Sequence, residues 1–248
     1  MTAPVFVVET VPGAGEYVLD GPEGRHAVSV RRLHAGEQVV LTDGEGAWAE
    51  GVVRAAEGKD RLVVDVTRGR AVAEEPSPRI TVVQALPKGD RGEVAVETMT
   101  ETGVDAIVPW TASRCITQWR GDRGAKSLAK WRATAREAGK QSRRVRFPRV
   151  YDAMSTKEVA RLLAGADLAA VLHEDREAGS APLATATLPA GGEIVLVVGP
   201  EGGVSPEELA VFAEAGAAPY RLGPSVLRTS TAGTAAVALL LGRTGRWS

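Results

Sequence analysis

The pattern of apolar and polar residues in the first part of the chain differs from that in the second part. In the first part, short apolar runs alternate with turn residues, which predicts β-strands at residues 38–42 and 47–53. Asp43-Gly44-Glu45-Gly46 lies between them and indicates a hairpin, because Asp tolerates and Gly prefers positive φ. The other expected elements are strands at residues 5–8, 17–19 and 61–66 and a short helix at 26–33. Their size and spacing suit a compact β-barrel.

A polar stretch containing prolines, residues 73–78, interrupts this pattern, and we place a linker there between domains at residues 1–72 and 79–248. Beyond it, apolar strands alternate with helices, which is typical of an α/β domain with a largely parallel sheet. The expected strands are residues 80–85, 105–109, 168–172 and 193–198. The expected helices are about residues 91–102, 127–142, 155–163 and 229–241.

Composition indicates an ordinary globular protein, with 44% hydrophobic and 25% charged residues. The longest apolar run, residues 235–241, is far shorter than the roughly 20 residues that span a bilayer, and the N-terminus lacks an export signal. We therefore expect a cytoplasmic protein without a membrane partner. The single cysteine, Cys115, excludes an intrachain disulfide and a cysteine-based zinc site. Because His26, His34 and His173 have no ligand spacing, we expect no metal.

A glycine-rich turn, Gly199-Pro200-Glu201-Gly202-Gly203, directly follows the last long strand. A helix then opens with Ser205 as its N-cap, Pro206 at its first position and Glu208 at its third. In open α/β sheets, ligands bind beyond the carboxyl ends of the strands, and glycines let the backbone approach them. A plain tight turn is the alternative. The spacing matches neither the dinucleotide nor the nucleoside triphosphate motif.

A second unusual segment, residues 221–232, contains a Gly-Pro turn and a Thr/Ser cluster that we expect to cap the final helix. Arg228 lies at the N-terminus of this helix, where the helix macrodipole disfavours a cation. Such a position suggests that Arg228 holds an anionic group. A surface arginine in a salt bridge is the alternative.

The two segments together resemble the C-terminal signature of RsmE-type SPOUT methyltransferases, which is Gly-Pro-Glu-Gly-Gly followed by Leu-Gly-Pro-x-x-Leu-Arg-x-x-Thr-Ala. Earlier motifs are similar to those of the same family and come in the same order, so the resemblance spans residues 28–241. They are Lys88-Gly89-Asp90-Arg91, Glu101-x-Gly103-Val104, Ser113-Arg114-Cys115 and Glu137-Ala138-x-x-Gln141-Ser142-x-Arg144.

The resemblance implies an enzyme that uses S-adenosylmethionine to methylate N3 of a uridine in 16S ribosomal RNA, within the 30S subunit. It further implies a PUA-like RNA-binding barrel, an α/β SPOUT domain tied in a C-terminal trefoil knot, and a homodimer. Knots are so rare that periodicity would not have suggested one. The positions that match the family's donor site are Leu172, His173, Gly199, Pro200, Glu201, Gly202, Leu222, Gly223 and Leu227. The family often has Glu where this chain has Ser230, so we assign that position no role.

Basic residues are concentrated between residues 126 and 149, in a chain whose net charge is −1. Such a patch can neutralise several phosphates and make RNA binding depend on salt. Glu137, Gln141 and Arg144 share one helical face, which is either solvated or lines the RNA cleft or the dimer seam. We expect Trp119 and Trp131 to be partly buried in the core. The residues expected to contact RNA are Arg25, Arg31, Arg32, Lys88, Arg91, Arg114, Lys140, Arg143 and Arg146.

Methylation of uracil N3 requires removal of the N3 proton from an unpaired or extruded base. We expect Arg228 to stabilise the negative charge that develops on the uracil carbonyls, with Arg144, from a partner subunit, as the second choice. The base is left open: Glu201, Glu137 and His173 are the candidates, and loss of the proton to solvent is the alternative.

Two other readings are a SPOUT methyltransferase acting on a ribose 2′-OH or on transfer RNA, and an RNA-binding relative without catalysis. The intact glycine turn and Leu227-Arg228 argue against the second. An α/β hydrolase finds no support, because the chain has no G-x-S-x-G motif.

Overall fold

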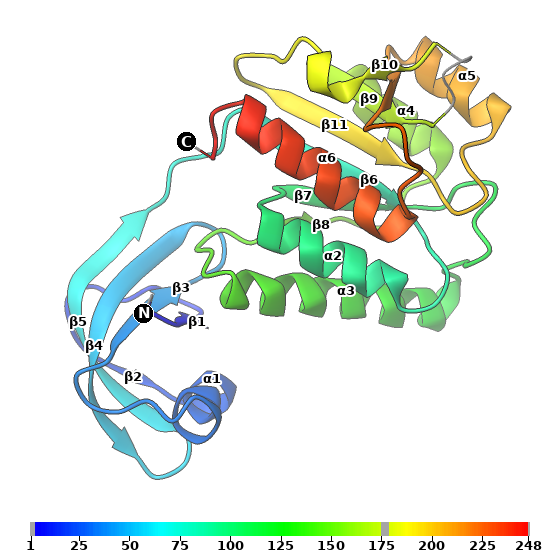
Figure 1. The fold of residues 1–248 in the computed structure, drawn as a ribbon. Helices are drawn as coiled ribbons and strands as arrows, with labels where there is room; N and C mark the ends of the chain where they lie inside the picture. The colour runs from blue at the N-terminus through cyan, green and yellow to red at the C-terminus, as the bar shows by residue number, and fades with distance from the viewer. Residues whose placement is uncertain (1–2, 175–178, 248) are drawn as a thin grey trace. The chain divides into compact units, whose positions relative to one another are not determined.

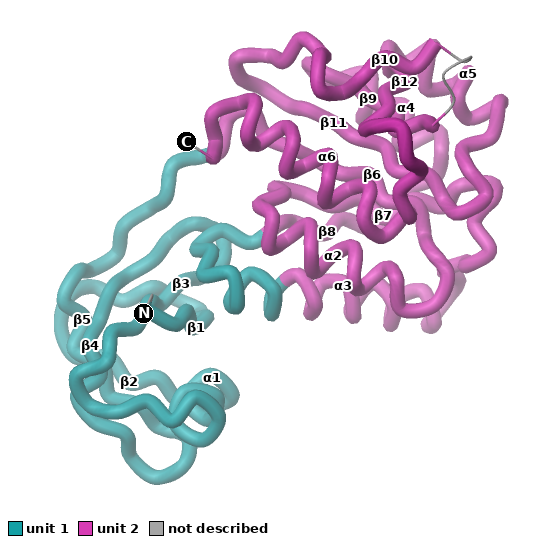
Figure 2. The backbone as a smooth tube through the Cα atoms, in the orientation of Figure 1, with its two compact units in different colours: residues 1–75, 136–147 teal, residues 76–135, 148–248 magenta. Residues whose placement is uncertain are grey.

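A computed structural model describes residues 3–174 and 179–247 of the chain (Figure 1). The chain forms two compact units, residues 1–75 with 136–147 (unit 1) and residues 76–135 with 148–248 (unit 2), as Figure 2 shows. The division after Glu75 falls inside the expected linker. Residues 136–147, however, belong to unit 1, although the sequence pattern had assigned them to the second domain.

Unit 1 contains a five-stranded sheet in the order β1-β3-β4-β5-β2. β1 is parallel to β3, and the other pairs are antiparallel. Buried and more exposed residues alternate along the first half of β4, because one face of the sheet covers a core that includes Phe6, Leu41 and Leu62. The expected hairpin joins β3 to β4. The strands are β1 (Val5–Val7), β2 (Gly15–Leu19), β3 (Gln38–Thr42), β4 (Ala47–Glu57) and β5 (Arg61–Val72).

The helix expected at residues 26–33 begins earlier and is of mixed type. It starts as α1 (Gly21–Arg25), with Pro22 in its first turn, and continues as a π-helical turn, η1 (His26–Val30). Pro is favoured at the start of a helix because its missing N–H has no partner there anyway. Ala27 and Leu33 are buried against the sheet.

Backbone contacts explain why residues 136–147 belong to unit 1. Thr42 Oγ1 donates to the Val145 carbonyl over 2.9 Å, and the Phe147 N–H donates to the Gly44 carbonyl over 2.7 Å. Gly44 has a φ of 79°, and a Cβ there would lie 2.7 Å from the Phe147 ring. The glycine is thus required both by the turn and by the close approach of this distant segment.

Unit 2 contains a seven-stranded sheet, parallel throughout, in the order β10-β12-β9-β11-β6-β7-β8. The central strand β11 is almost completely buried, as its continuous apolar sequence predicts. The strands are β6 (Arg79–Ala85), β7 (Ala106–Trp110), β8 (Arg149–Val150), β9 (Leu168–Leu172), β10 (Ala181–Pro182), β11 (Glu193–Val198) and β12 (Ala218–Arg221). The short strands β8, β10 and β12 were not predicted.

The helices of unit 2 include α6, which packs on α2 and on strands β6 and β11 (Figure 1). Trp131 is buried and meets Trp119 edge-on at 5.0 Å between ring centroids, which confirms that both tryptophans serve the core. No helix in the described residues is long and apolar enough to span a membrane. The helices are α2 (Arg91–Thr102), α3 (Gly121–Gln141, whose end belongs to unit 1), α4 (Thr156–Ala164), η2 (Leu183–Thr185), α5 (Pro206–Glu214) and α6 (Thr229–Arg243).

Candidate functional site

A cavity of about 390 Å³ lies in unit 2 at the carboxyl ends of β9, β11 and β12. In the sheet, β7 and β8 follow β6 toward one edge. The next strand in sequence, β9, lies on the other side of β6, beyond β11. A reversal of this kind is where open parallel sheets bind ligands. The wall consists of residues 172–174, most of 198–204, and 220–229, with Arg91 and Ala232.

The positions expected to meet the methyl donor line this cavity, with one exception. Gly202 does not line it, because this glycine faces Arg114, whose Nη1 donates to the Gly202 carbonyl over 3.1 Å. Arg228 also lines the cavity, whereas Arg144 belongs to unit 1. The expected positions that do line it are Leu172, His173, Gly199, Pro200, Glu201, Leu222, Gly223 and Leu227.

The glycine-rich turn is held closely by its own neighbours. A Cβ on Gly199 would lie only 2.9 Å from Cγ2 of Val204. Gly203, at a φ of 73°, donates its N–H to the Pro200 carbonyl over 2.9 Å and closes the turn. The predicted capping box is present, because Ser205 and Glu208 exchange hydrogen bonds between side chain and backbone. Glycine is therefore required here by packing as well as by φ.

Besides its part in the capping box, Glu208 binds two distant segments, which the sequence did not reveal. Its buried carboxylate accepts from the Ser113 N–H over 2.7 Å and from the Thr156 hydroxyl over 3.1 Å. The loop after β7 is thereby tied to the start of α5. Next in that loop are Arg114, bound to Gly202, and Cys115, whose thiol pKa is raised by burial.

Three arginines line the cavity, and they differ in their partners. Arg91 lies 3.6 Å from the Glu201 carboxylate, which also accepts from the Lys88 N–H over 3.2 Å. Arg221 donates to the Ser180 carbonyl. Arg228 is exposed and makes no side-chain hydrogen bond or ion pair with any residue that the structure describes. The guanidinium of Arg228 is therefore available to a ligand.

The basic residues expected at RNA are divided between the units, and one of them must be corrected. Lys140 is buried, because its ammonium group lies 2.8 Å from the Glu23 carboxylate inside unit 1, so it is not a surface contact for phosphate. Arg146 is half-buried and bridges Glu75 and the Ala73 carbonyl. The sequence pattern could not reveal these partners, which are distant along the chain. The exposed members are Arg25, Arg31 and Arg32 in unit 1 and Lys88 and Arg114 in unit 2, and the half-buried ones include Arg143 in unit 1 and Arg91 in unit 2.

The described residues contain no group of side chains suited to bind a metal ion. No cluster of three or more His, Cys, Asp or Glu side chains among them could hold an ion. The cavity instead combines glycines, prolines and leucines with arginine guanidinium groups, which suits an organic ligand with anionic parts.

Comparison with known proteins identifies the family. A profile described as an RNA methyltransferase domain matches residues 73–241, and one described as an RNA methyltransferase PUA domain matches residues 19–67. The chain is 45% identical to the ribosomal RNA small subunit methyltransferase E of Mycobacterium bovis, over 100% of this chain and 94% of that protein. The crystal structure of the enzyme of that name from Neisseria gonorrhoeae, bound to S-adenosylmethionine, superposes with a TM-score of 0.82 at 28% identity, covering 98% of each chain. The chain therefore belongs to the ribosomal RNA small subunit methyltransferase E family.

Proposed function

We propose that this protein transfers the methyl group of S-adenosylmethionine to N3 of a uridine in 16S ribosomal RNA. The observation that carries the proposal is the cavity at the ends of β9, β11 and β12, with its glycine-rich turn and with Arg228, whose side chain has no hydrogen bond or ion pair among the described residues. The relative from Neisseria gonorrhoeae binds S-adenosylmethionine, and the relative from Mycobacterium bovis is a small-subunit ribosomal RNA methyltransferase.

The residues of the cavity fit the methyl donor. A volume of about 390 Å³ lies in the range of small-molecule sites, which is about 300–1,000 Å³. The turn at Gly199 and the side chains of Leu172, Leu222 and Leu227 line the cavity, so backbone and apolar groups would face the ligand. When bound, S-adenosylmethionine supplies a methyl group already activated by the charge on its sulfur.

Arg228 acts on the acceptor in this proposal. Deprotonation at N3 spreads negative charge over the uracil carbonyls, and an arginine can stabilise that charge by charge-assisted hydrogen bonds. Glu201 is not assigned as the base, because its carboxylate already accepts from the Lys88 N–H and lies beside Arg91. The loop 88–91 is thereby held against the glycine-rich turn at residues 199–203, which we call the donor turn. We assign no residue as the base.

The assembly implied by the family extends the proposal. The segments that wall the cavity would be those tied in the trefoil knot, and unit 1 would bind RNA through Arg25, Arg31 and Arg32. Val226, 73% exposed beside the cavity, offers apolar surface that a second copy would cover in a homodimer, which would also bring Arg144 of the partner within reach. A substrate within the 30S subunit would place the protein in the cytoplasm.

The test is a methyl-transfer assay with labelled S-adenosylmethionine and 30S subunits from a strain that lacks the gene, followed by nucleoside mass spectrometry. We expect 3-methyluridine in 16S RNA. A different methylated nucleoside would contradict the uridine assignment, and absence of both transfer and donor binding would contradict the proposed activity. Arg228→Ala should lower kcat on the order of 100-fold with unchanged donor affinity. Arg161→Ala, on the exposed face of α4, is the matched control and should retain full activity.

A further inference from the structure

A buried glutamine lies below the cavity, at the carboxyl end of β6. The side chain of Gln84 is completely buried, and its Nε2 donates to Thr229 Oγ1 over 3.0 Å and to the Ala85 carbonyl over 3.1 Å. Thr229, also buried, donates its hydroxyl proton to the Gly199 carbonyl over 2.8 Å. A chain of hydrogen bonds therefore runs from β6 through the first residue of α6 to the first residue of the donor turn.

The direction of this chain follows from donor and acceptor chemistry. A carbonyl can only accept, so the single proton of the Thr229 hydroxyl goes to Gly199, and the Thr229 oxygen must accept from Gln84. Gln84 then has to present its amide nitrogen to Thr229. Among the described residues its Oε1 has no hydrogen-bond partner and is buried. Because a buried polar atom without a partner is unfavourable, stability alone does not account for a glutamine here.

The chain of hydrogen bonds joins the two segments that wall the cavity. Gly199 begins the donor turn, and Thr229 is adjacent to Arg228. The Arg228 carbonyl accepts from the N–H groups of Thr231 and Ala232, so Arg228 is fixed to the first turn of α6. The Thr/Ser cluster was expected to cap α6, but α6 has no side-chain cap, and the Thr229 hydroxyl is directed to Gly199 instead.

We propose that Gln84 and Thr229 are positioning residues, which hold Arg228 in register with the donor turn through the Gly199 carbonyl. This proposal rests on the proposed function, because it assumes that Arg228 and the turn act together in methyl transfer. Reacting groups must be held within fractions of an ångström, and a displacement of about 1 Å can lower a rate on the order of 100-fold. The network joins the two segments with neutral hydrogen bonds; Gly199 and Thr229 line the cavity, and Gln84 supports them from behind its wall.

Thr234 provides a matched control on the same helix. Its hydroxyl lies 2.7 Å from that of Thr98 and joins α6 to α2, and it does not line the cavity. Thr98 can still donate to the Val94 carbonyl when Thr234 is replaced. Thr234→Val therefore removes a hydroxyl from α6, as Thr229→Val does, but away from the two segments that the proposal joins.

The experiment compares Thr229→Val, Thr229→Ser, Gln84→Leu and Thr234→Val in the full chain. Melting temperature, the Kd of S-adenosylmethionine by calorimetry, and kcat and KM on 30S subunits are measured for each. We expect Thr229→Val and Gln84→Leu to lower kcat on the order of 10- to 100-fold with little change in the KM for 30S subunits. Thr229→Ser keeps the hydroxyl and should restore kcat, and Thr234→Val should turn over like the wild type.

Several results would overturn the proposal. Wild-type kcat in Thr229→Val, or equal losses in Thr229→Ser and Thr229→Val, would show that the hydroxyl does not position the site. If kcat falls as much in Thr234→Val as in Thr229→Val, the loss comes from a general effect on α6 and not from the hydrogen bond of Thr229. If the wild type itself transfers no methyl group, the proposed function fails and this proposal with it. An active wild type with fully active variants refutes the positioning role alone.

Discussion

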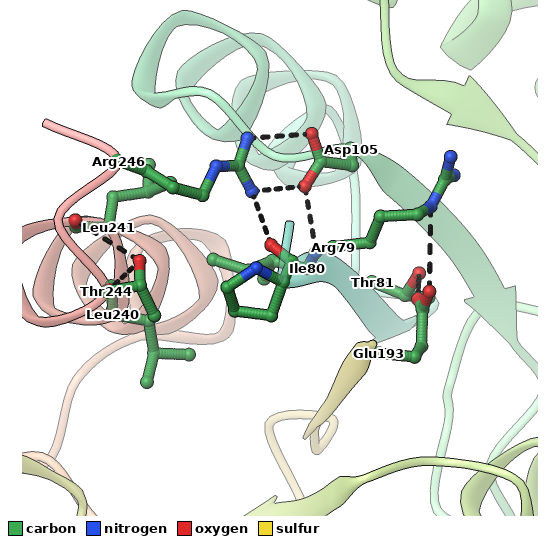
Figure 3. Close-up of polar contacts among 10 residues, drawn as sticks. Arg79, Ile80, Thr81, Asp105, Glu193, Leu240, Leu241, Thr244 and Arg246 are labelled. Carbon is green, nitrogen blue, oxygen red and sulfur yellow. Dashed lines mark hydrogen bonds and ion pairs between the residues drawn. The ribbon is translucent and has the colours of Figure 1, made fainter. Parts of the chain in front are cut away.

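Replacement of Arg246 by alanine should strongly destabilise unit 2. Arg246 follows α6 near the C-terminus and binds Asp105 with both guanidinium nitrogens, at 2.6 and 2.9 Å (Figure 3). The Asp105 carboxylate also accepts from the Ile80 N–H over 2.8 Å, and Arg246 donates to the Pro78 carbonyl over 3.0 Å. The pair thus fastens the end of the chain to the beginning of β6 and to the start of β7.

The magnitude follows from burial. The Asp105 side chain is 3% exposed and that of Arg246 is 17% exposed, so Arg246→Ala leaves a carboxylate buried with one remaining N–H partner. Removal of one partner from a buried pair costs about 3–5 kcal/mol, and the partial exposure of Arg246 favours the lower end, about 3 kcal/mol. At about 2–4 °C per kcal/mol for a protein of this size, the melting temperature should fall by about 6–12 °C.

Intrinsic tryptophan fluorescence is a suitable assay. Of the 5 tryptophans, all but Trp48 lie in unit 2, so heating reports mainly on that unit. Arg246→Lys keeps the charge but loses the bidentate geometry, so its melting temperature should lie between those of the wild type and Arg246→Ala. Arg161→Ala serves again as the control and should melt with the wild type. If Arg246→Ala melts within about 2 °C of the wild type, the carboxylate is compensated in some other way, and the argument from burial is refuted.

Two further substitutions test the site and unit 1. Gly199→Ala should weaken S-adenosylmethionine binding on the order of tenfold, because the new Cβ would lie 2.9 Å from Val204 and displace the turn. Calorimetry measures this, with Gly242→Ala as the control, since nothing lies within 4 Å of a Cβ there. Lys140→Met should destabilise unit 1 by about 1–3 kcal/mol, because Glu23 loses the cation at 2.8 Å. Amide hydrogen exchange of β3 and β4 under native conditions checks this, and unchanged protection of these strands would contradict it.

Much of the glycine-rich turn at residues 199–203 could be predicted from the sequence because its structure is local. The apolar run of β11, the glycines and the Ser205–Glu208 capping box lie within one short stretch, and each depends on neighbours a few residues away. The carboxyl end of a parallel strand is, in addition, where ligands bind. The nine positions expected at the donor came from the resemblance to the family, and eight of them line the cavity, Gly202 being the one that does not.

The environment of Lys140 could not be predicted in the same way. A lysine among basic residues on a helix is normally solvated, and the pattern indicated a phosphate contact. Its partner Glu23 lies 117 positions earlier in the chain, and only the packing of residues 136–147 into unit 1 brings the two together. The short strands β8, β10 and β12 were missed for a related reason, since they depend on pairing with neighbours rather than on a pattern of their own.

Several of the motifs are joined to one another by hydrogen bonds in this structure. Ser113 donates its N–H to Glu208, and Arg114 donates its guanidinium N–H to the Gly202 carbonyl, so the Ser-Arg-Cys loop supports the donor turn from outside. At the other end of that turn, the Thr229 hydroxyl, which accepts from Gln84, donates to the Gly199 carbonyl. The glycine-rich turn is therefore held at Gly199 and at Gly202 by segments that are distant in the sequence. A change in one loop is therefore expected to disturb the cavity even where the changed residue does not line it, and Glu208, which is buried outside the cavity wall and accepts from the Ser113 N–H, is the clearest such position.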